Sequence, residues 1–357
     1  MIDAWPADSV SDLSDSAVPA VPAVRRLERL MDGYVTTQLL YVAAKLGIAD
    51  VLADADGPQT GPAIAARVGA DPDLLTRVLR GLVLEGVLAE HPNGGFVLTG
   101  LGSCLRATAP DSMRGPIIAR GEVYYSAAGG LLRTVVDGGT AFQHVYGERF
   151  FDHLASHPEH DAAFHASMAG RAQQEADAVV ATYDFGKLNR LVDVGGGRGV
   201  LTAAILRAAP GLHAELLDRP TAIEDARRYL AAHGLADRCS CIAGDFFDAV
   251  PAGADAYLLS RIIHDWNDDD ARQILATVRA AMPPAGRVLL AEAILPERVS
   301  DQPGAIRMDL NMLILFGTKE RTAAQYRDLL AQAGLRIRQI LPTPSPAGLS
   351  VIEATIA

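Results

Sequence analysis

A glycine-rich segment constrains the fold of this chain more than any other feature of its sequence. The stretch LVDVGGGRG at residues 191–199 follows an apolar run and leads into a helical pattern that begins at Val200. A strand, a glycine turn and a helix indicate an α/β sheet with a ligand at the turn, because glycine lets the backbone approach that ligand closely. The glycines miss the dinucleotide pattern G-x-G-x-x-G, whose last glycine would replace Val200. We therefore assign contacts with a different nucleotide-containing cofactor to three loop residues: Asp193, Gly195 and Gly197.

Further strand-like segments follow the loop, and their ends carry side chains that suit the same cofactor. Between helical stretches stand HAELLDRP (213–220), RCSCIAGDFFD (238–248) and ADAYLLS (254–260). The carboxyl ends of parallel strands meet in one crevice. We expect Asp218 to accept hydrogen bonds from a ribose diol, Asp245 to accept from an adenine amino group, and Phe246 to lie against the adenine ring. Each carboxylate alone is equally well explained as a helix cap or a loop charge, but the ordered set favours a cofactor site.

The chain changes character near residue 183. Helical periodicity dominates before it, whereas short apolar runs alternate with amphipathic helices after it, as in a parallel α/β sheet. We therefore expect a disordered tail over residues 1–22, a mostly helical domain over residues 23–182, and a Rossmann-like α/β domain over residues 183–357.

Residues 60–100 carry the pattern of a winged helix. A short helix ends at Gly69, a second begins after Asp71-Pro72, and two strand-like pieces flank a Pro-Asn-Gly-Gly turn. A winged helix suggests DNA binding as an alternative function. The basic and acidic residues of this segment are balanced, whereas DNA binding needs a basic excess. We expect the module to pack against another subunit instead.

The net charge of the chain limits the classes of partner that it can bind. The net charge is −11 and the pI is about 5.3, so we expect neither nucleic acid nor an anionic membrane as a partner. No apolar run reaches the roughly 18 residues that span a bilayer. The acidic, proline-containing N-terminus lacks the features of a secretory signal. We expect a cytoplasmic protein.

A candidate general base follows the fourth predicted strand. His264 comes shortly after that strand, Glu292 lies near the end of a fifth strand at 287–297, and Glu320 precedes a helix capped by Thr322. A phenol, with a pKa near ~10, is a poor nucleophile at neutral pH, and a histidine with a pKa near ~6.5 can take its proton as the phenol oxygen attacks an electrophile. Neighbouring carboxylates orient the imidazole and stabilise the imidazolium. Asp268 to Asp270 are interpreted as capping the next helix, and no metal is implied.

The segment 150–183 contains other chemistry-bearing residues. His153 and His157, four residues apart, could share a metal, but Pro158 interrupts the run and no HExxH-type carboxylate follows. We favour a solvated helix pair. Phe164 and Met168 are core residues by default, and they line a substrate pocket only if this helix covers the active site.

These motifs together resemble the plant caffeic acid O-methyltransferase-like family, and its bacterial natural-product branch more closely still. The resemblance covers the chain from about residue 25 and depends on LVDVGGGRG, LLDRP, GDFFD, HDW, AEAILPE and GTKERT. It implies a seven-stranded class I methyltransferase domain that uses S-adenosylmethionine (SAM), an intertwined homodimer formed through the N-terminal domain, and His264, flanked by Glu292 and Glu320, as the general base. It implies a cofactor contact at the position of Ser260, where plant members have lysine. It also implies an acceptor pocket lined by Phe164, Met168, Met308, Met312 and Phe316.

We therefore expect transfer of the SAM methyl group to a hydroxyl, phenolic in character, of a small aromatic natural product, with S-adenosylhomocysteine as the second product. Two alternatives share the fold: methylation of carbon or nitrogen on a similar acceptor, and a SAM-binding relative that does not methylate. The sequence does not name the acceptor.

Overall fold

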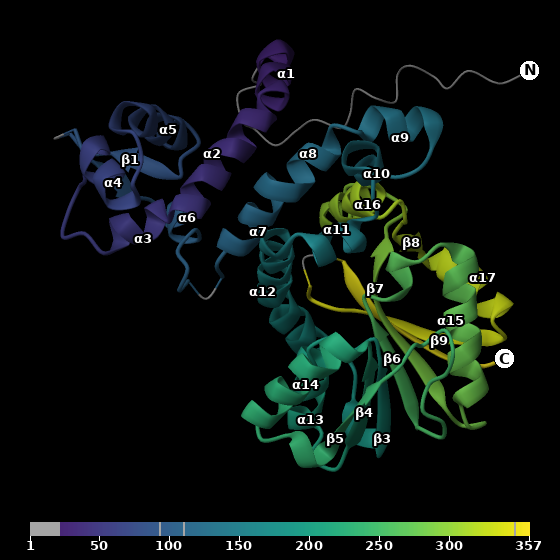
Figure 1. The fold of residues 1–357 in the computed structure, drawn as a ribbon. Coiled ribbons are helices and arrows are strands. Elements are labelled where there is room, and N and C mark those ends of the chain that lie inside the picture. The colour runs from purple at the N-terminus through teal and green to yellow at the C-terminus, as the bar shows by residue number, and fades with distance from the viewer. Residues whose placement is uncertain (1–21, 93, 110, 346–347) are drawn as a thin grey trace, which may run out of the picture.

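The structure is a computed structural model that describes residues 22–92, 94–109, 111–345 and 348–357. Nearly all of the predicted tail, residues 1–22, lies outside the described residues. Figure 1 shows a helical N-terminal part, coloured purple to teal, beside an α/β part coloured teal to yellow. The predicted fold class is confirmed, while the residue boundaries of the domains stay predictions.

The first part of the chain folds into helices and one small sheet. The predicted order of two helices followed by a strand pair is confirmed, because β1 and β2 pair antiparallel directly after α4 and α5. The elements are α1 (Ala23–Met31), α2 (Gly33–Leu46), α3 (Ile48–Ala53), α4 (Gly61–Val68), α5 (Pro72–Leu84), β1 (Leu88–Glu90), β2 (Phe96–Leu98) and α6 (Gly100–Ser103).

Local signals explain where these helices begin and end. Asp71 caps α5, because its Oδ1 accepts from the N–H groups of Asp73 and Leu74, both at 2.9 Å. Gly69 ends α4 in the left-handed region, at φ 70°, where other L residues are strained.

Helices also fill most of the chain from Arg114 to Thr182, as predicted. They are α7 (Arg114–Ala119), the π-helical turn η2 (Arg120–Tyr124), α8 (Tyr125–Ala128), α9 (Leu131–Asp137), α10 (Ala141–Tyr146), α11 (Phe150–Ser156) and α12 (Pro158–Thr182). The long helix α12 contacts both α7 and α13, so it joins the N-terminal part to the α/β part.

The α/β part is built on one sheet with the strand order β5-β4-β3-β6-β7-β10-β9. Neighbouring strands are parallel except that β10 is antiparallel to β7 and β9, and the short β8 pairs with β7. The strands are β3 (Arg190–Val194), β4 (His213–Asp218), β5 (Cys239–Ala243), β6 (Ala256–Ser260), β7 (Arg287–Leu295), β8 (Arg321–Thr322), β9 (Leu335–Pro342) and β10 (Leu349–Ile356).

Helices cover both faces of this sheet (Figure 1). One apolar cluster joins the sheet to α12, α13 and α14, and a second joins it to α15 and α17. The helices and short turns are η3 (Phe185–Lys187), α13 (Val200–Ala208), α14 (Pro220–Ala232), η4 (Ala236–Arg238), η5 (Ile263–Asp265), α15 (Asp268–Ala281), α16 (Pro303–Leu315) and α17 (Ala323–Gln332). Strand β3 lies between β4 and β6, so the chain order reverses there, and ligands of open α/β sheets bind at such a point.

Candidate active site

The glycine loop lies at the point where the strand order reverses. Gly195, Gly197 and Gly199 have φ values of 75°, 56° and 79°, which explains the choice of glycine at each of these three positions. A Cβ on Gly195 would lie 2.4 Å from Cδ1 of Ile262 and 3.5 Å from the ring of Phe246. The missing side chain therefore lets Ile262 and Phe246 approach the loop more closely than any other residue at this position would allow.

Two aspartates support the loop in different ways. Asp218 ends β4, is half-buried, and accepts a hydrogen bond from the N–H of Gly197 at 2.8 Å. Asp193 is 1 % exposed and lies beneath the loop, where it accepts from the hydroxyl of Thr202. Burial raises the pKa of Asp193 to about 6, the nearby Asp218 charge adds to this, and the Thr202 hydrogen bond opposes it. Asp193 thus braces the loop from below, whereas Asp218 borders the crevice.

The remaining predicted cofactor residues lie on neighbouring strand ends. Asp245 is exposed and accepts from the N–H of Phe247 at 2.9 Å. Phe246 is half-buried and meets Trp266 edge to face at 6.0 Å. Ser260 is the half-buried last residue of β6. These side chains fit a cofactor that contains adenosine. The carboxylate of Asp218 can accept hydrogen bonds from a ribose, that of Asp245 can accept from the adenine amino group, and the ring of Phe246 can lie against the adenine.

The candidate base follows β6 directly. His264 lies in η5, is 7 % exposed, and its Nδ1 is 2.9 Å from Oε1 of Glu320. A carboxylate accepts hydrogen bonds, so Nδ1 carries the proton and Nε2 is the nitrogen with the free lone pair. Nε2 lies 3.5 Å from Oδ1 of Asp265. The neutral imidazole is therefore held in the tautomer that accepts a proton at Nε2.

Glu292 supports His264 through the backbone. Glu292 is fully buried on β7, and its Oε1 accepts from the N–H groups of Ile262 at 3.0 Å and Ile263 at 2.7 Å. The predicted pair of glutamates therefore divides its work: Glu320 bonds the ring, and Glu292 holds the turn that presents it.

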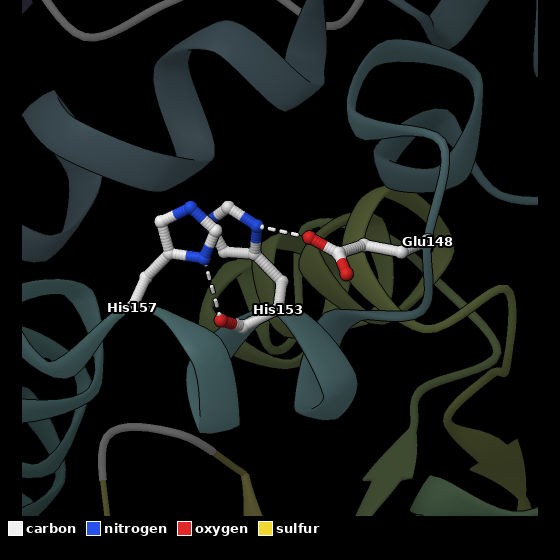
Figure 2. Close-up of side chains that lie close together, drawn as sticks. All are labelled: Glu148, His153 and His157. Atoms are coloured by element: carbon white, nitrogen blue, oxygen red, sulfur yellow. Dashed lines mark hydrogen bonds and ion pairs between the residues drawn. The ribbon is translucent and has the colours of Figure 1, made fainter.

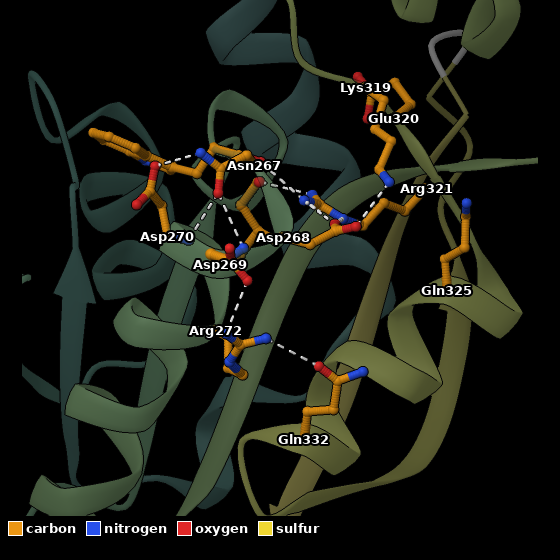
Figure 3. Close-up of polar contacts among 12 residues, drawn as sticks. Asn267, Asp268, Asp269, Asp270, Arg272, Lys319, Glu320, Arg321, Gln325 and Gln332 are labelled. Atoms are coloured by element: carbon orange, nitrogen blue, oxygen red, sulfur yellow. Dashed lines mark hydrogen bonds and ion pairs between the residues drawn. The ribbon is translucent and has the colours of Figure 1, made fainter.

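A buried arginine ties this turn to β8 (Figure 3). Arg321 is 0 % exposed and donates from Nη1 to the carbonyl of Ile263 and from Nη2 to that of Trp266, both at 2.8 Å. It also binds Asp268 through Nε and Nη2 at 3.0 and 2.8 Å, and Lys319 binds the same carboxylate. The two carbonyls flank His264, so Arg321 fixes the backbone on both sides of the base.

The same network corrects our interpretation of the acidic run. Asn267, rather than an aspartate, caps α15, because its Oδ1 accepts from the N–H groups of Asp269 and Asp270 at 3.0 and 2.9 Å (Figure 3). The aspartates occupy the first helical turn, where the helix dipole favours them.

Electrostatics set the proton affinity of the base. Burial lowers the pKa of His264, but the carboxylates of Asp265, Glu292 and Glu320 outweigh it and raise the pKa to about 9. Burial raises the pKa of Glu292 to about 7, against the opposing charges of His264 and Arg261.

The same three side chains could also be considered as metal ligands. One nitrogen or oxygen atom from each of His264, Glu292 and Glu320 lies within 4.8 Å of the others, which is close enough for a metal on distance alone. Oε1 of each glutamate accepts from the ring or the backbone, so we assign these two oxygens to hydrogen bonding, whereas Oε2 of each is buried without a partner among the described residues.

The predicted acceptor residues gather on α12 and α16. Phe164 and Phe316 belong to one apolar cluster, in which both rings meet Phe150 edge to face, at 5.1 and 5.0 Å. Helix α16 carries the buried Met312 and the half-buried Met308, and Met168 is half-buried on α12. Asp309 joins this helix to the base, because its Oδ1 accepts from the N–H of Glu320 at 2.8 Å.

The histidines of α11 and α12 are not the solvated pair that we expected. His153 is 3 % exposed, its Nδ1 lies 2.8 Å from Oε1 of Glu148, and its Nε2 lies 2.8 Å from Nδ1 of His160. Figure 2 shows the His157 ring beside the His153 ring; the two are stacked at 3.8 Å. Nδ1 of His157 faces the carbonyl of His153 at 2.9 Å. Only His157 of this pair keeps the predicted exposure, because His153 is buried against Phe142, whose ring is 5.3 Å away, and links Glu148 to the half-buried His160.

Fold and site together define a class of protein: a Rossmann-like enzyme whose glycine loop lies at the point where the strand order reverses, with a buried histidine–glutamate pair on the turn after β6. A family model described as the O-methyltransferase domain matches residues 129–336, and the O-methyltransferase dimerisation domain matches residues 28–108. The chain belongs to the O-methyltransferase family. It is an enzyme, and its methyl donor is SAM.

Individual relatives span nearly the whole chain. A phenazine O-methyltransferase from Lysobacter antibioticus is 44% identical over 92% of this chain and 95% of its own length. An 8-amino-8-demethylriboflavin N,N-dimethyltransferase from Streptomyces davaonensis is 39% identical over 85% and 88%. The structure of an O-methyltransferase from neocarzinostatin biosynthesis, in complex with SAM and 2-hydroxy-5-methyl naphthoic acid, has a TM-score of 0.79 and 34% identity, and covers 90% of this chain and 96% of that one.

Among the described residues, no helix combines the length and the apolar character needed to cross a membrane.

Proposed function

We propose that this enzyme methylates a phenolic hydroxyl of a small aromatic natural product, with His264 as the general base. The observation that carries the proposal is the 2.9 Å contact between Nδ1 of His264 and Glu320, which leaves Nε2 as the proton acceptor. Aromatic acceptors are supported by the Phe150, Phe164 and Phe316 rings and by the aromatic compounds in the relatives' names.

The chemistry divides between cofactor and chain. SAM supplies an electrophilic methyl group on a sulfonium and leaves as S-adenosylhomocysteine. The hydroxyl oxygen forms the new C–O bond as the C–S bond breaks, and its proton passes to Nε2 of His264. Glu320 stabilises the imidazolium that forms, and Glu292 and Arg321 keep the ring in place. The buried cluster excludes water, which strengthens these charge interactions.

Nitrogen methylation is the second candidate, because a relative that is 39% identical is named as an N,N-dimethyltransferase. The two candidates differ in the product. We propose to incubate the enzyme with methyl-labelled SAM and paired scaffolds that bear either a phenol or an aromatic amine. A labelled methoxy group, identified by NMR together with S-adenosylhomocysteine release, supports the proposal. A labelled methyl group on nitrogen or carbon would contradict oxygen methylation and establish the other acceptor atom. Turnover of SAM without a methylated product would overturn both candidates.

We also propose that the enzyme is a homodimer formed through its N-terminal domain. Two observations support this proposal. A dimerisation-domain model matches residues 28–108, and α1 carries an exposed stripe of apolar residues. Figure 1 shows that helix α1 lies away from the α/β part. The stripe consists of residues that are 68–70 % exposed: Val24, Leu27, Leu30 and Met31.

A further inference from the structure

Arg261 adopts an unusual backbone conformation immediately before the turn that carries the base. Its φ is 56°, and it is the only non-glycine residue with positive φ among the described residues. Its N–H donates to the carbonyl of Ala291 at 3.1 Å, which ends the pairing of β6 with β7. A non-glycine residue in this region costs energy, and such strain gathers at functional sites. The backbone conformation of Arg261 therefore points to a function of its side chain.

The Arg261 guanidinium lies between α12 and the base. Its Nη2 donates to Oε1 of Glu175 at 2.6 Å, and its Nε donates to Oε2 of Glu175 at 3.3 Å. Its Nη1 lies 3.6 Å from Oε1 of Glu320, the same oxygen that accepts from His264. Nη1 is buried and has no hydrogen-bond partner in the part of the chain that the structure describes. Glu175 thus anchors one edge of the guanidinium, and the other edge faces the glutamate of the base.

The charges around the base are otherwise mainly negative. Asp265, Glu292 and Glu320 act on His264, and Asp309 on α16 acts on Glu320. The phenol of Tyr326 on α17, whose pKa burial raises, is an uncharged group near Glu292 and Glu320. Arg321 also lies nearby, but Asp268 and two carbonyls hold its guanidinium. Arg261 is the cation whose free edge faces Glu320. A histidine that is already protonated cannot accept the proton of a phenol, so this charge balance bears directly on the reaction.

We propose that Arg261 is a positioning residue that lowers the pH at which the buried group formed by His264 and Glu292 releases its proton, and that Glu175 holds it in place for this role. The inference rests on the proposed function of His264 as the base. A positive charge beside the group repels the proton, and the anchoring carboxylate of Glu175 partly offsets that repulsion. Because the charges of His264 and Glu292 act on each other, the prediction concerns the apparent pKa of this group.

The test uses substitutions that shift the charge in opposite directions. Arg261→Met removes the cation and should raise the apparent pKa of the group by about one unit. Glu175→Gln keeps an amide oxygen that accepts from Nη2 of Arg261, and so keeps the anchor, but it removes the offsetting anion and should lower the pKa. The double variant should return toward the wild-type value. Arg261→Lys keeps the charge and should lie nearer to the wild type than Arg261→Met does. Arg272→Met, which removes a cation from an exposed pair with Asp269, is the matched control and should leave the pKa unchanged.

The pKa is measured by two independent readouts: the acidic limb of kcat/KM against pH, and NMR titration of the His264 imidazole in histidine-labelled protein. Opposite shifts in the two single variants support the inference. A purely structural role predicts that both variants lose turnover without opposite shifts, and that result would overturn it. If Arg261→Met does not fold, Glu175→Gln decides alone, because an unchanged or raised pKa contradicts the inference. The NMR titration needs no acceptor, so failure of the inference is distinguishable from failure of the proposed reaction.

Discussion

Oε1 of Glu320 lies 2.9 Å from Nδ1 of His264 and 3.6 Å from Nη1 of Arg261. One carboxylate oxygen therefore lies close to both the imidazole of His264 and the guanidinium of Arg261. Glu320 also receives support from the substrate side, since its N–H donates to Asp309 on α16. Glu320 therefore connects α16 through its N–H, His264 through Oε1, and α12 through Arg261 and Glu175.

Replacing Glu320 by Gln tests the value of its charge. The amide oxygen can still accept from Nδ1, so the tautomer is kept, but the imidazolium loses its stabilising anion. We expect kcat to fall about 10-fold to 100-fold, with little change in SAM affinity. Steady-state kinetics and calorimetric SAM binding measure these two effects. Asp309→Asn, which keeps an acceptor for the Glu320 N–H, serves as the control. An unchanged kcat in Glu320→Gln contradicts the assigned role.

Replacing Arg321 by Met tests how the turn is held. The change leaves the carbonyls of Ile263 and Trp266 without their donor, so both kcat and stability should fall. We expect a loss of about 3 kcal/mol in the free energy of unfolding. Lys319→Met removes only the half-exposed partner of the shared Asp268 and should cost no more than about 1 kcal/mol. Denaturant unfolding of the two variants compares the losses, and equal losses would argue against a specific role for Arg321.

Replacing Gly195 by Ala tests the cofactor crevice. The new Cβ would lie 2.4 Å from Ile262 at a φ of 75°, so either the loop or Ile262 must move. We expect the affinity for SAM to fall by a factor of about 10 or more. A factor of 10 corresponds to roughly 1.4 kcal/mol, which backbone strain or displacement of the loop can account for. Gly234→Ala introduces similar backbone strain, at φ 68°, in open space away from the loop. Calorimetric titration should show normal SAM affinity in this control; a comparable loss in both would assign the effect to general instability.

The apolar stripe of α1 tests the homodimer. Leu27→Glu places a charge on a residue that is 69 % exposed in the single chain and that the proposed interface would bury. Burying an unpaired charge is costly, so we expect the variant to dissociate into monomers. Light scattering after size exclusion gives the mass. Val299→Glu, at a residue 65 % exposed in the α/β part, is the control and should remain dimeric. A dimeric Leu27→Glu variant would exclude this face from the interface.

The sequence predicted the strands, the glycine loop and the residues at the strand ends because these depend on local periodicity and on backbone demands. It also placed His264 and Glu320 together. It did not reveal the roles of Arg261 or Arg321, because the partners of a long charged side chain depend on which segments the fold brings near. Glu175 lies 86 residues from Arg261 in the chain. The buried His153 was likewise missed, since spacing along a helix does not tell which face packs against Phe142.

Single-turnover methyl transfer by wild type and His264→Gln, followed across pH, tests the central claim most directly. The single-turnover rate of the wild type should rise with pH up to about pH 9. The carboxylates raise the pKa of His264 to about 9, and only the neutral imidazole accepts a proton. His264→Gln should bind SAM normally and transfer its methyl group more slowly by a factor on the order of 10² or more. Acceptors whose phenol is already ionised should largely escape this loss, because they need no base. A His264→Gln enzyme that methylates a neutral phenol at nearly the wild-type rate would contradict the account.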